Sequence, residues 1–324
     1  MAAALPEPAA AALDTIRACA PEAAAQAART LAVLFDGYVP PLPAEASVLN
    51  RGGGPLEFSC SGADLRYTVD LGGPVGTRLA RIRDRIRALD PGWACPALDG
   101  WTPREPLSWG AWLGVRHRAG GPPRFKVYVE TPPGTLPEDL GEAGWPAGDH
   151  RPLPPTLAGF PGEGEADRRE LYFEIPHRGL PVASLERLMA QVGLERRAPD
   201  LLRLVDAFEF RHPGPALPDA RLGFSTSLDR RRLAPVFSLF AFAPDLVGDE
   251  RAVRWQILRR AAARGIALGP YECLTAALAE GPGEPDIHNI VAFVVDRAAP
   301  PAIQITFRPP GSPRARTDNP RSMP

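Results

Sequence analysis

Lysine is almost absent from this chain of 324 residues. Lys126 is the only lysine, so arginine accounts for 36 of the 37 positively charged side chains. A composition this rich in Ala, Pro and Arg is typical of a coding bias that replaces lysine wherever arginine serves equally well. At a site of fixed geometry, a compact ammonium and a planar guanidinium are not interchangeable. Lys126 is therefore predicted to be functional, although an incidental place on a solvent-facing strand also fits the segment.

Several motifs that identify enzyme classes are also missing. There is no Gly-Lys-Ser/Thr sequence for a Walker A loop, and the glycines at 72–76 lack the Gly-x-Gly-x-x-Gly spacing. The five histidines show no metal-ligand spacing, and neither Asp-Asp-x-x-Asp nor Gly-x-Ser-x-Gly occurs. No partner motif supports a pyridoxal Schiff base on Lys126. We therefore expect no organic cofactor.

Cysteine pairs, long apolar runs and excess charge are lacking as well. Cys19, Cys60, Cys95 and Cys273 are scattered, so neither a zinc site nor a disulfide framework is indicated, and a reducing cytoplasm fits. No apolar run reaches transmembrane length, and the Ala-rich start lacks the basic residues of a signal peptide. A net charge of −1 gives no reason to expect nucleic acid or membrane as a partner. We expect one cytoplasmic domain over 1–310 and a disordered tail over 311–324.

What is present is an alternation of amphipathic helices and β-hairpins. Helices are expected over 8–35, 76–89, 182–192 and 250–263, and a long loop over 131–168. Strands are expected over 55–60, 64–71, 112–118, 124–130, 171–176, 205–211, 220–227, 235–242, 288–296 and 302–308. Since hairpins pair antiparallel strands, the pattern argues against Rossmann and TIM arrangements.

The first hairpin shows how the strands are expected to be used. If residue 59 pairs with 66 and 57 with 68, Glu57, Ser59, Arg66 and Thr68 share one polar face. The opposite face is apolar and would be covered by the helices. The predicted fold is therefore α+β, with a ten-stranded antiparallel barrel whose polar lumen is surrounded by helices. An open antiparallel sheet with a solvated polar face is the alternative.

Polar residues on like faces of successive hairpins suggest a receptor for a diphosphate. Arginine, lysine and tyrosine side chains bind such a group through charge-assisted hydrogen bonds, while a carboxylate could orient or deprotonate a second substrate. The residues in this set are Glu57, Arg66, Arg116, Lys126, Tyr128 and Arg221.

The same residues carry a family resemblance that covers roughly residues 45–310. Pro55-Leu56-Glu57-Phe58-Ser59, followed by Arg66, resembles the opening motif of aromatic prenyltransferases of the indole, or dimethylallyltryptophan synthase, type. Lys126-Val127-Tyr128 resembles the Lys-x-Tyr strand of that family, and Arg221-Leu222-Gly223 is similar to its later Arg-x-Lys-x-Tyr strand. The resemblance implies the ABBA barrel, with the active site in the lumen.

The resemblance also implies roles. Glu57 would hold the N–H or O–H of the acceptor. Arg66, Lys126 and Arg221 would bind the diphosphate of an allylic donor such as dimethylallyl diphosphate, and Tyr128 would shield the allyl cation. Further lumen or substrate positions are Arg116, Tyr172, Glu174, Ser225, Gln304 and Thr306.

Departures from the family pattern modify these expectations. Gly223 and Ser225 stand where the family has lysine and tyrosine, and only five tyrosines are present, which predicts a thin aromatic shield. The short chain is similar in length to the peptide-modifying branch, whose members use magnesium. We therefore expect Mg²⁺ to assist, with Glu130 or Glu174 as ligands.

The expected activity is transfer of a dimethylallyl or related group to an aromatic or other nucleophilic side chain of a peptide or tryptophan-derived acceptor, in secondary metabolism. A non-catalytic barrel that binds a small molecule or peptide is the alternative.

Overall fold

The computed structural model describes residues 5–38, 47–99, 101, 107–118, 120–132, 134–135, 147–148, 151–162, 168–175, 179–208, 215–229, 235–247, 250–279 and 287–310. The tail predicted at 311–324 and part of the loop predicted at 131–168 lie outside these ranges.

Ten antiparallel strands close into one barrel in the order β1-β12-β11-β10-β9-β8-β7-β4-β3-β2. This result confirms the barrel and excludes the open sheet. Its strands are β1 Leu56–Cys60, β2 Leu65–Val69, β3 Ala111–His117, β4 Arg124–Glu130, β7 Pro155–Pro161, β8 Arg168–Glu174, β9 Leu222–Asp229, β10 Val236–Phe242, β11 His288–Asp296 and β12 Ala302–Phe307. A separate two-stranded sheet pairs β5 Ala147–Gly148 with β6 Arg151–Pro152.

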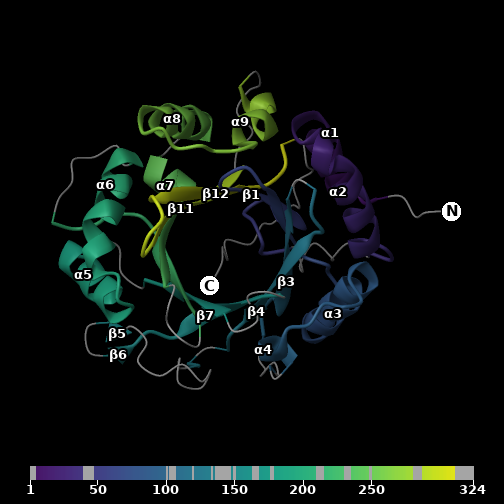
Figure 1. Ribbon diagram of the computed structural model, residues 1–324, viewed down its shortest axis with the longest axis horizontal. Coiled ribbons are helices and arrows are strands. Elements are labelled where there is room, and N and C mark those ends of the chain that lie inside the picture. Colours follow the sequence, from purple (N-terminus) through teal and green to yellow (C-terminus); the bar gives the residue numbers. More distant parts are fainter. Residues whose placement is uncertain are drawn as a thin grey trace.

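Helices surround the barrel on its outer side (Figure 1). They are α1 Glu7–Cys19, α2 Pro21–Leu34, α3 Arg78–Leu89, α4 Pro96–Asp99, α5 Val182–Gln191, α6 Ala198–Phe208, α7 Ala243–Val247, α8 Glu250–Ala263 and α9 Tyr271–Leu274. Short 3₁₀ turns lie at Val75–Thr77, Glu195–Arg197 and Ala276–Leu278. In the described ranges, none of these helices combines the length and the apolar composition that crossing a bilayer requires.

Three sequence predictions about elements were wrong. Residues 205–208 belong to helix α6 rather than a strand, because the apolar residues of α6 recur at helical spacing and are buried. The tenth strand is instead β7, which lies inside the predicted loop. The helix predicted over 8–35 is two helices, since Ala20 leaves the helical conformation directly before Pro21.

The alternation of the strands decides where the hydrophobic core lies. Residues such as Phe58, Val127 and Phe224 are buried in one large cluster with apolar residues of the helices. Stacked rings of Phe173, Phe224 and Phe237 continue this layer across β8, β9 and β10, with ring centroids 4.7 and 5.4 Å apart. The main core therefore lies between barrel and helices, and the other face of every strand is left for the lumen.

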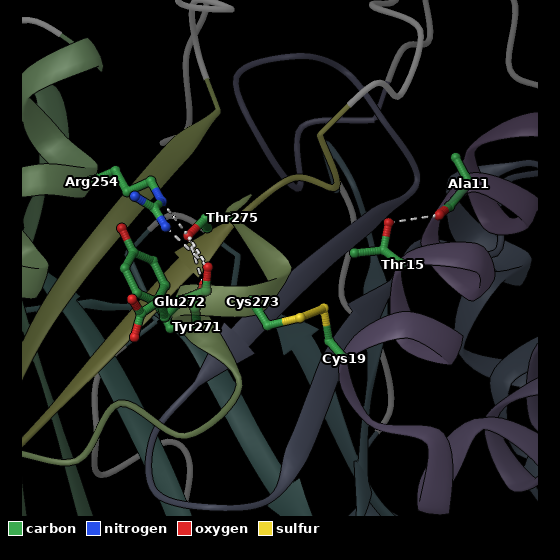
Figure 2. Close-up of a disulfide and its surroundings, with 8 residues drawn as sticks. All are labelled: Ala11, Thr15, Cys19, Arg254, Tyr271, Glu272, Cys273 and Thr275. Carbon is green, nitrogen blue, oxygen red and sulfur yellow. Dashed lines mark hydrogen bonds between the residues drawn. A yellow bond between two sulfur atoms is a disulfide. The ribbon is translucent and has the colours of Figure 1, made fainter. Parts of the chain in front are cut away.

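A disulfide joins Cys19 at the end of α1 to Cys273 in α9, 254 residues apart (Figure 2). The prediction that the cysteines form no disulfide was therefore wrong. Packing of α1 against α9 brings the two residues together, and sequence spacing carries no trace of such a contact. Cys60 and Cys95 remain free and buried. Because structural disulfides persist chiefly in oxidising compartments, this bond does not support the predicted cytoplasmic location.

Candidate active site

Lys126 lies in the lumen at the centre of a network that spans three strands. Its ammonium forms an ion pair with Glu170 of β8 and donates a hydrogen bond of 3.1 Å to the Tyr172 hydroxyl. Ser225 of β9 donates to the same Glu170 carboxylate at 2.7 Å. Burial alone would lower the pKa of Lys126, but the charge of Glu170 outweighs it and raises that pKa. Lys126 is therefore a firmly charged group that already has a carboxylate partner.

Gly159 on the intervening strand β7 makes this contact between β4 and β8 feasible. A Cβ atom at Gly159 would lie 2.6 Å from Lys126 Cε, well inside van der Waals contact. The missing side chain lets the lysine stem pass across β7 to reach Glu170. The Lys126 side chain therefore packs directly against the backbone of Gly159 along the lumen wall. This close packing supports the prediction that the only lysine of the chain is not incidental.

Glu57 is a buried carboxylate on another part of the lumen wall, on β1. It pairs in register with Thr68, as predicted, and is 6% exposed. Asn289 donates a hydrogen bond of 2.9 Å to its Oε1 atom. Burial raises the pKa of Glu57 to about 7, and its hydrogen bonds with Thr306 and Asn289 only partly oppose this shift. A carboxylate with this pKa can accept a proton near neutral pH.

The raised pKa predicts how Glu57 affects stability. An acid with a pKa of about 7 in the folded protein, against 4.5 ordinarily, holds its proton more tightly when folded. Its contribution to stability is therefore complete below about pH 4.5 and is lost as the pH rises through 7. The glutamine of Glu57→Gln does not ionise, so the variant does not lose stability in this way. Its free energy of unfolding, relative to that of the wild type, should therefore rise by about 3 kcal/mol between pH 4.5 and 8.

Urea unfolding of both proteins at several pH values measures this difference. Glu174→Gln is the matched control, because it makes the same substitution at an exposed carboxylate at the end of β8. A stability difference between Glu57→Gln and wild type that does not change with pH would contradict the assignment.

Arg66 and Arg116 lie together near the β1–β2 turn. Arg116 forms an ion pair with Asp64, and Arg66 and Arg118 each approach the same carboxylate at 3.8 Å. Burial, reinforced by the charge of Arg116, lowers the pKa of Arg66, and its Nε atom is buried with no partner among the described residues. One carboxylate is thus shared by three guanidinium groups, which leaves this end of the lumen positively charged.

A cavity of about 700 Å³ opens at this end of the barrel. Arg66, Arg116 and Asp64 line it from the barrel, and Arg203 and Arg264 line it from α6 and the segment after α8. Phosphate oxygens would find several guanidinium donors there.

Arg221 lies elsewhere. Its guanidinium binds Asp245 of α7 at 3.2 Å and covers the Phe242 ring, with 4.0 Å between the guanidinium carbon and the ring centroid. Along β9, Arg221 is four residues from Ser225, the position that contacts the Lys126 network, or about 13 Å. The structure therefore does not bring Arg221 to Lys126, contrary to the expectation of a shared diphosphate site.

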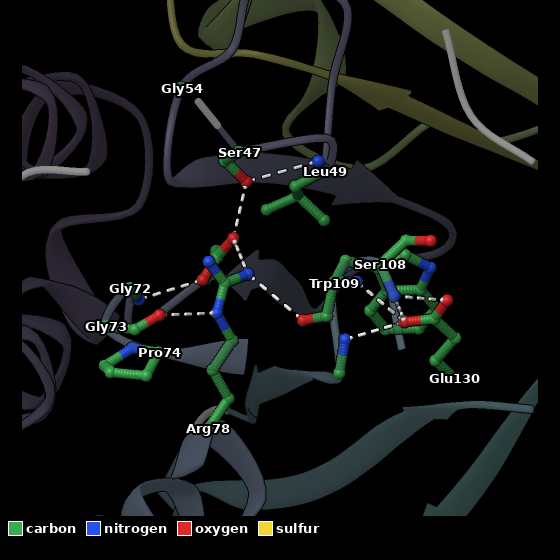
Figure 3. Close-up of polar contacts among 12 residues, drawn as sticks. Ser47, Leu49, Gly54, Gly72, Gly73, Pro74, Arg78, Ser108, Trp109 and Glu130 are labelled. Carbon is green, nitrogen blue, oxygen red and sulfur yellow. Dashed lines mark hydrogen bonds and ion pairs between the residues drawn. The ribbon is translucent and has the colours of Figure 1, made fainter. Parts of the chain in front are cut away.

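The remaining predicted lumen positions fall in different places. Ser225 and Tyr172 join the Lys126 network, and Thr306 joins Glu57. Gln304 lies two residues before Thr306 on β12, opposite Ala292. Glu130 accepts hydrogen bonds of 2.7 to 2.9 Å from the backbone amides of residues 108–110 (Figure 3). Its carboxylate therefore holds a turn in place, which leaves Glu130 poorly suited to be a metal ligand.

The aromatic lining is fuller than five tyrosines suggest. Ring centroids of Tyr128 and Tyr172 lie 6.0 Å apart, and Phe240 continues the series 6.4 Å beyond Tyr172. The Phe240 ring covers Gly223, since a Cβ atom there would lie 2.3 Å from it. Glycine at the position of the family lysine thus makes room for an aromatic ring. Lys126 Nζ is 4.9 Å from the centroid of the Tyr128 ring.

Sequence reasoning missed several residues of this lumen, among them Glu170, Asn289 and Phe240. Phe240 could have been found, since alternation along the predicted strand 235–242 puts it on one face with Ser238. Glu170 fell in a segment interpreted as the edge of a loop. Asn289 gives no signal of its own, because only barrel closure brings β11 near β1.

Comparisons with known proteins were made for both sequence and structure. The sequence matches no protein-family model and no curated protein. The structure is similar to 5-dimethylallyltryptophan synthase from Streptomyces coelicolor, with 19% identity, a TM-score of 0.71 and coverage of 98% of this chain and 100% of that one. It is also similar to 6-dimethylallyltryptophan synthase from Micromonospora olivasterospora in complex with DMASPP and Trp. The identity is 16%, the TM-score is 0.71, and the alignment covers 97% of this chain and 99% of that one.

A third similar structure is that of the prenyltransferase PriB in ternary complex with L-tryptophan and dimethylallyl thiolodiphosphate. It shares 16% identity with a TM-score of 0.69, and the alignment covers 94% of this chain and 96% of that one. Matches of this extent cover the whole barrel and its surrounding helices. The chain therefore has the closed ten-stranded barrel fold of the dimethylallyltryptophan synthases and PriB.

Proposed function

We propose that this protein is a prenyltransferase, which moves a dimethylallyl or related group from an allylic diphosphate to an aromatic or other nucleophilic side chain. The observation that carries the proposal is the lumen itself. Its wall holds Lys126 and Arg66, a series of aromatic rings and a buried carboxylate with a pKa near 7, and a cavity lined by four arginines opens at one rim of the same barrel. The peptide or tryptophan-derived nature of the acceptor, and a place in secondary metabolism, are parts of the same proposal.

The donor diphosphate binds at the turn end of the lumen in this proposal. Arg66 and Arg116 donate to its oxygens, and Lys126 reaches it from β4. As the allylic C–O bond breaks, the diphosphate leaves with the electron pair, and these cations stabilise its growing charge. The rings of Tyr128, Tyr172 and Phe240 face the allyl cation, whose charge is attracted to their π-systems.

The acceptor occupies the side of the lumen that holds Glu57. Its nucleophilic atom attacks the allyl cation to form the new bond, and the proton that it loses passes to the Glu57 carboxylate. Asn289 and Thr306 orient that carboxylate through their hydrogen bonds. No water competes if the acceptor and the aromatic wall fill the space around the cation.

Mass spectrometry of reaction mixtures tests the function. The full chain is incubated with dimethylallyl diphosphate and a panel of L-tryptophan, tryptophan-containing cyclic dipeptides and cyclic peptides. Addition of one dimethylallyl group in place of a proton supports the proposal, with Glu57→Gln as the inactive control. Donor binding without transfer to any acceptor would favour the second candidate, a non-catalytic binding barrel. The binding candidate is favoured by the ion pairs of Lys126 with Glu170 and of Arg221 with Asp245, because carboxylates within the protein already neutralise these two cations.

Magnesium is a further part of the proposal. The described residues hold no group of three or more His, Cys, Asp or Glu side chains that could form a metal site. Mg²⁺ nevertheless needs only one or two carboxylates when phosphate oxygens and waters complete its shell. Glu170, next to Lys126, would hold it rather than the expected Glu174, which is exposed four residues further along at the end of β8. The ion would supply charge neutralisation for the donor. The lumen residues fit such a donor-bound ion.

We accordingly expect turnover to rise severalfold when Mg²⁺ is added to EDTA-treated protein, because the carboxylate partners of Lys126 and Arg116 reduce the positive charge available to the diphosphate. Glu170→Gln should reduce this response, whereas Glu174→Gln should not. Full activity in EDTA would show that the protein's own cations suffice.

A further inference from the structure

The Glu57 carboxylate is held in place by the first residues of β11. Asn289 donates a hydrogen bond of 2.9 Å to this carboxylate. Thr306, which also forms a hydrogen bond with Glu57, accepts one of 3.1 Å from the backbone amide of Ile290. Two neighbouring residues of β11 therefore fix both of these contacts, and a shift at the start of the strand would disturb both together.

The start of β11 is an irregular part of the barrel. The register of β11 against β12 shifts between His288 and Val291, which interrupts the backbone ladder on that side of the strand. His288 Nε2 lies 2.7 Å from the hydroxyl of Tyr271 in helix α9, and both residues are fully buried. Adjacent residues of this bulge thus contact an outer helix, through His288, and the lumen carboxylate, through Asn289.

Helix α9 is a single turn of four residues, too short to be stable without tertiary contacts. Arg254 of α8 donates to the Thr275 hydroxyl at 3.1 Å and to the Glu272 carbonyl at 3.2 Å (Figure 2). The Cys19–Cys273 disulfide adds a covalent bond to α1, whose own buried residues pack into the main core. The disulfide therefore ties α9, and with it the start of β11, to a firmly packed helix.

This disulfide lies where a reductant can reach it. Cys273 is exposed and Cys19 is half-buried, whereas the free Cys60 and Cys95 are buried. A thiolate of a dithiol attacks the Cys273 sulfur, the S–S bond breaks, and Cys19 leaves as a thiolate that takes up a proton. The second thiol of the reductant then displaces Cys273 and closes the reductant's own disulfide, so two electrons and two protons pass to the protein.

We propose that the Cys19–Cys273 disulfide is a redox switch of the Glu57 site, which is ordered while the bond is intact and loosened when a dithiol reduces it. Without the bond, α9 and the start of β11 leave their places more often. The carboxylate is then held less often in the orientation that the acceptor requires, so turnover falls. The effect on turnover rests on the proposed prenyl transfer, whereas the effect on the order of the site does not.

Hydrogen–deuterium exchange of the full chain, without substrates, tests the order of the site. Alkylation and mass spectrometry first establish that Cys19 and Cys273 are blocked before treatment with dithiothreitol and alkylated after it. Reduction should then speed amide exchange about tenfold in peptides that cover α9 and residues 287–291. Peptides that cover β4, on the opposite side of the barrel, should exchange as before.

Two tyrosine variants test the route from the disulfide to the site. Tyr271→Phe removes the hydroxyl that contacts His288, so exchange over 287–291 should already be fast, and reduction should change it by less than about twofold. Tyr67→Phe is the matched control, because the hydroxyl of buried Tyr67 lies 2.9 Å from His117 Nε2 in a similar pair on β2 and β3. It should keep the full response to reduction.

Prenyl transfer is measured in parallel with exchange. Reduction of the wild type should lower kcat severalfold and leave the affinity for dimethylallyl diphosphate within about twofold, because the loosened groups lie on the acceptor side. The double variant Cys19→Ser/Cys273→Ser should show the rate of the reduced wild type, with or without dithiothreitol.

The proposal is overturned if Cys19 and Cys273 are not joined in the untreated chain, if reduction leaves exchange over 287–291 unchanged, or if Tyr271→Phe keeps the wild-type response. A turnover that does not depend on the redox state of the bond would also overturn it. Faster exchange on reduction, without transfer to any acceptor, would support the coupling of the disulfide to the site and refute the proposed function.

Discussion

Replacing Glu57 with glutamine is expected to lower prenyl transfer by at least about 100-fold, the lower range for loss of a general base. The amide has the same shape and keeps a hydrogen bond to Asn289 within reach, but it cannot accept the acceptor's proton. Donor affinity should stay within about twofold, because the cations that line the donor cavity are on other strands. Turnover and donor binding are measured on the same preparation.

The pH dependence of the wild type provides a second check on Glu57. Its pKa of about 7 predicts that turnover rises with pH and levels off above neutrality, as the carboxylate loses its proton. Glu186→Gln, which changes an exposed carboxylate on helix α5 outside the barrel, should keep both the rate and the pH profile of the wild type. If Glu57→Gln loses donor affinity and keeps its turnover at saturation, Glu57 has no role with the acceptor.

Replacing Lys126 with arginine is expected to lower transfer by about 100-fold while the fold stays intact. The lysine stem passes over Gly159 with no space for a side chain beneath it, and the ammonium meets both Glu170 and Tyr172. A planar guanidinium preserves the charge and can still pair with Glu170, but it is longer and would displace the diphosphate. Misplacement of a reacting group by about 1 Å can cost a factor of this size.

Steady-state turnover and thermal unfolding of Lys126→Arg measure the two parts of this prediction. Because the chain has no second lysine, the control replaces an arginine with lysine instead of a lysine with arginine. Arg17→Lys on α1, where the guanidinium is exposed and paired with Asp14, should change neither quantity. Activity of Lys126→Arg within twofold of the wild type would show that any cation serves at this position.

The hairpin pattern of the sequence was sufficient to predict much of the barrel. Period-two alternation distinguishes a polar from an apolar face in each strand, and a two-residue turn sets the register of β1 and β2. The predicted pairs Glu57–Thr68 and Ser59–Arg66 are the pairs observed. The two errors in the strand list arose where this local signal is weak. Residues 205–208 satisfy helical spacing equally well, and β7 is interrupted by prolines and glycine.

Site residues could be predicted from the sequence where a side chain differs in charge from the residues around it. A lone lysine on a polar face and a carboxylate within an apolar strand are each enough to mark the lumen. Arginine carried no such information in a chain with so many arginines, so the sequence could not distinguish Arg66, which lies near Asp64, from Arg221, which pairs with Asp245 of α7.

By itself, therefore, the sequence determined which residues share a face in each strand that it identified, because the face of a strand residue depends only on alternation along its own strand. Only the tertiary structure decided which lumen residues meet. Lys126 contacts Glu170 across Gly159, Asn289 joins Glu57 to Leu49, and Cys19 bonds to Cys273. Each contact joins segments that are distant along the chain. Barrel closure and helix packing set these distances, and neither leaves a local pattern in the sequence.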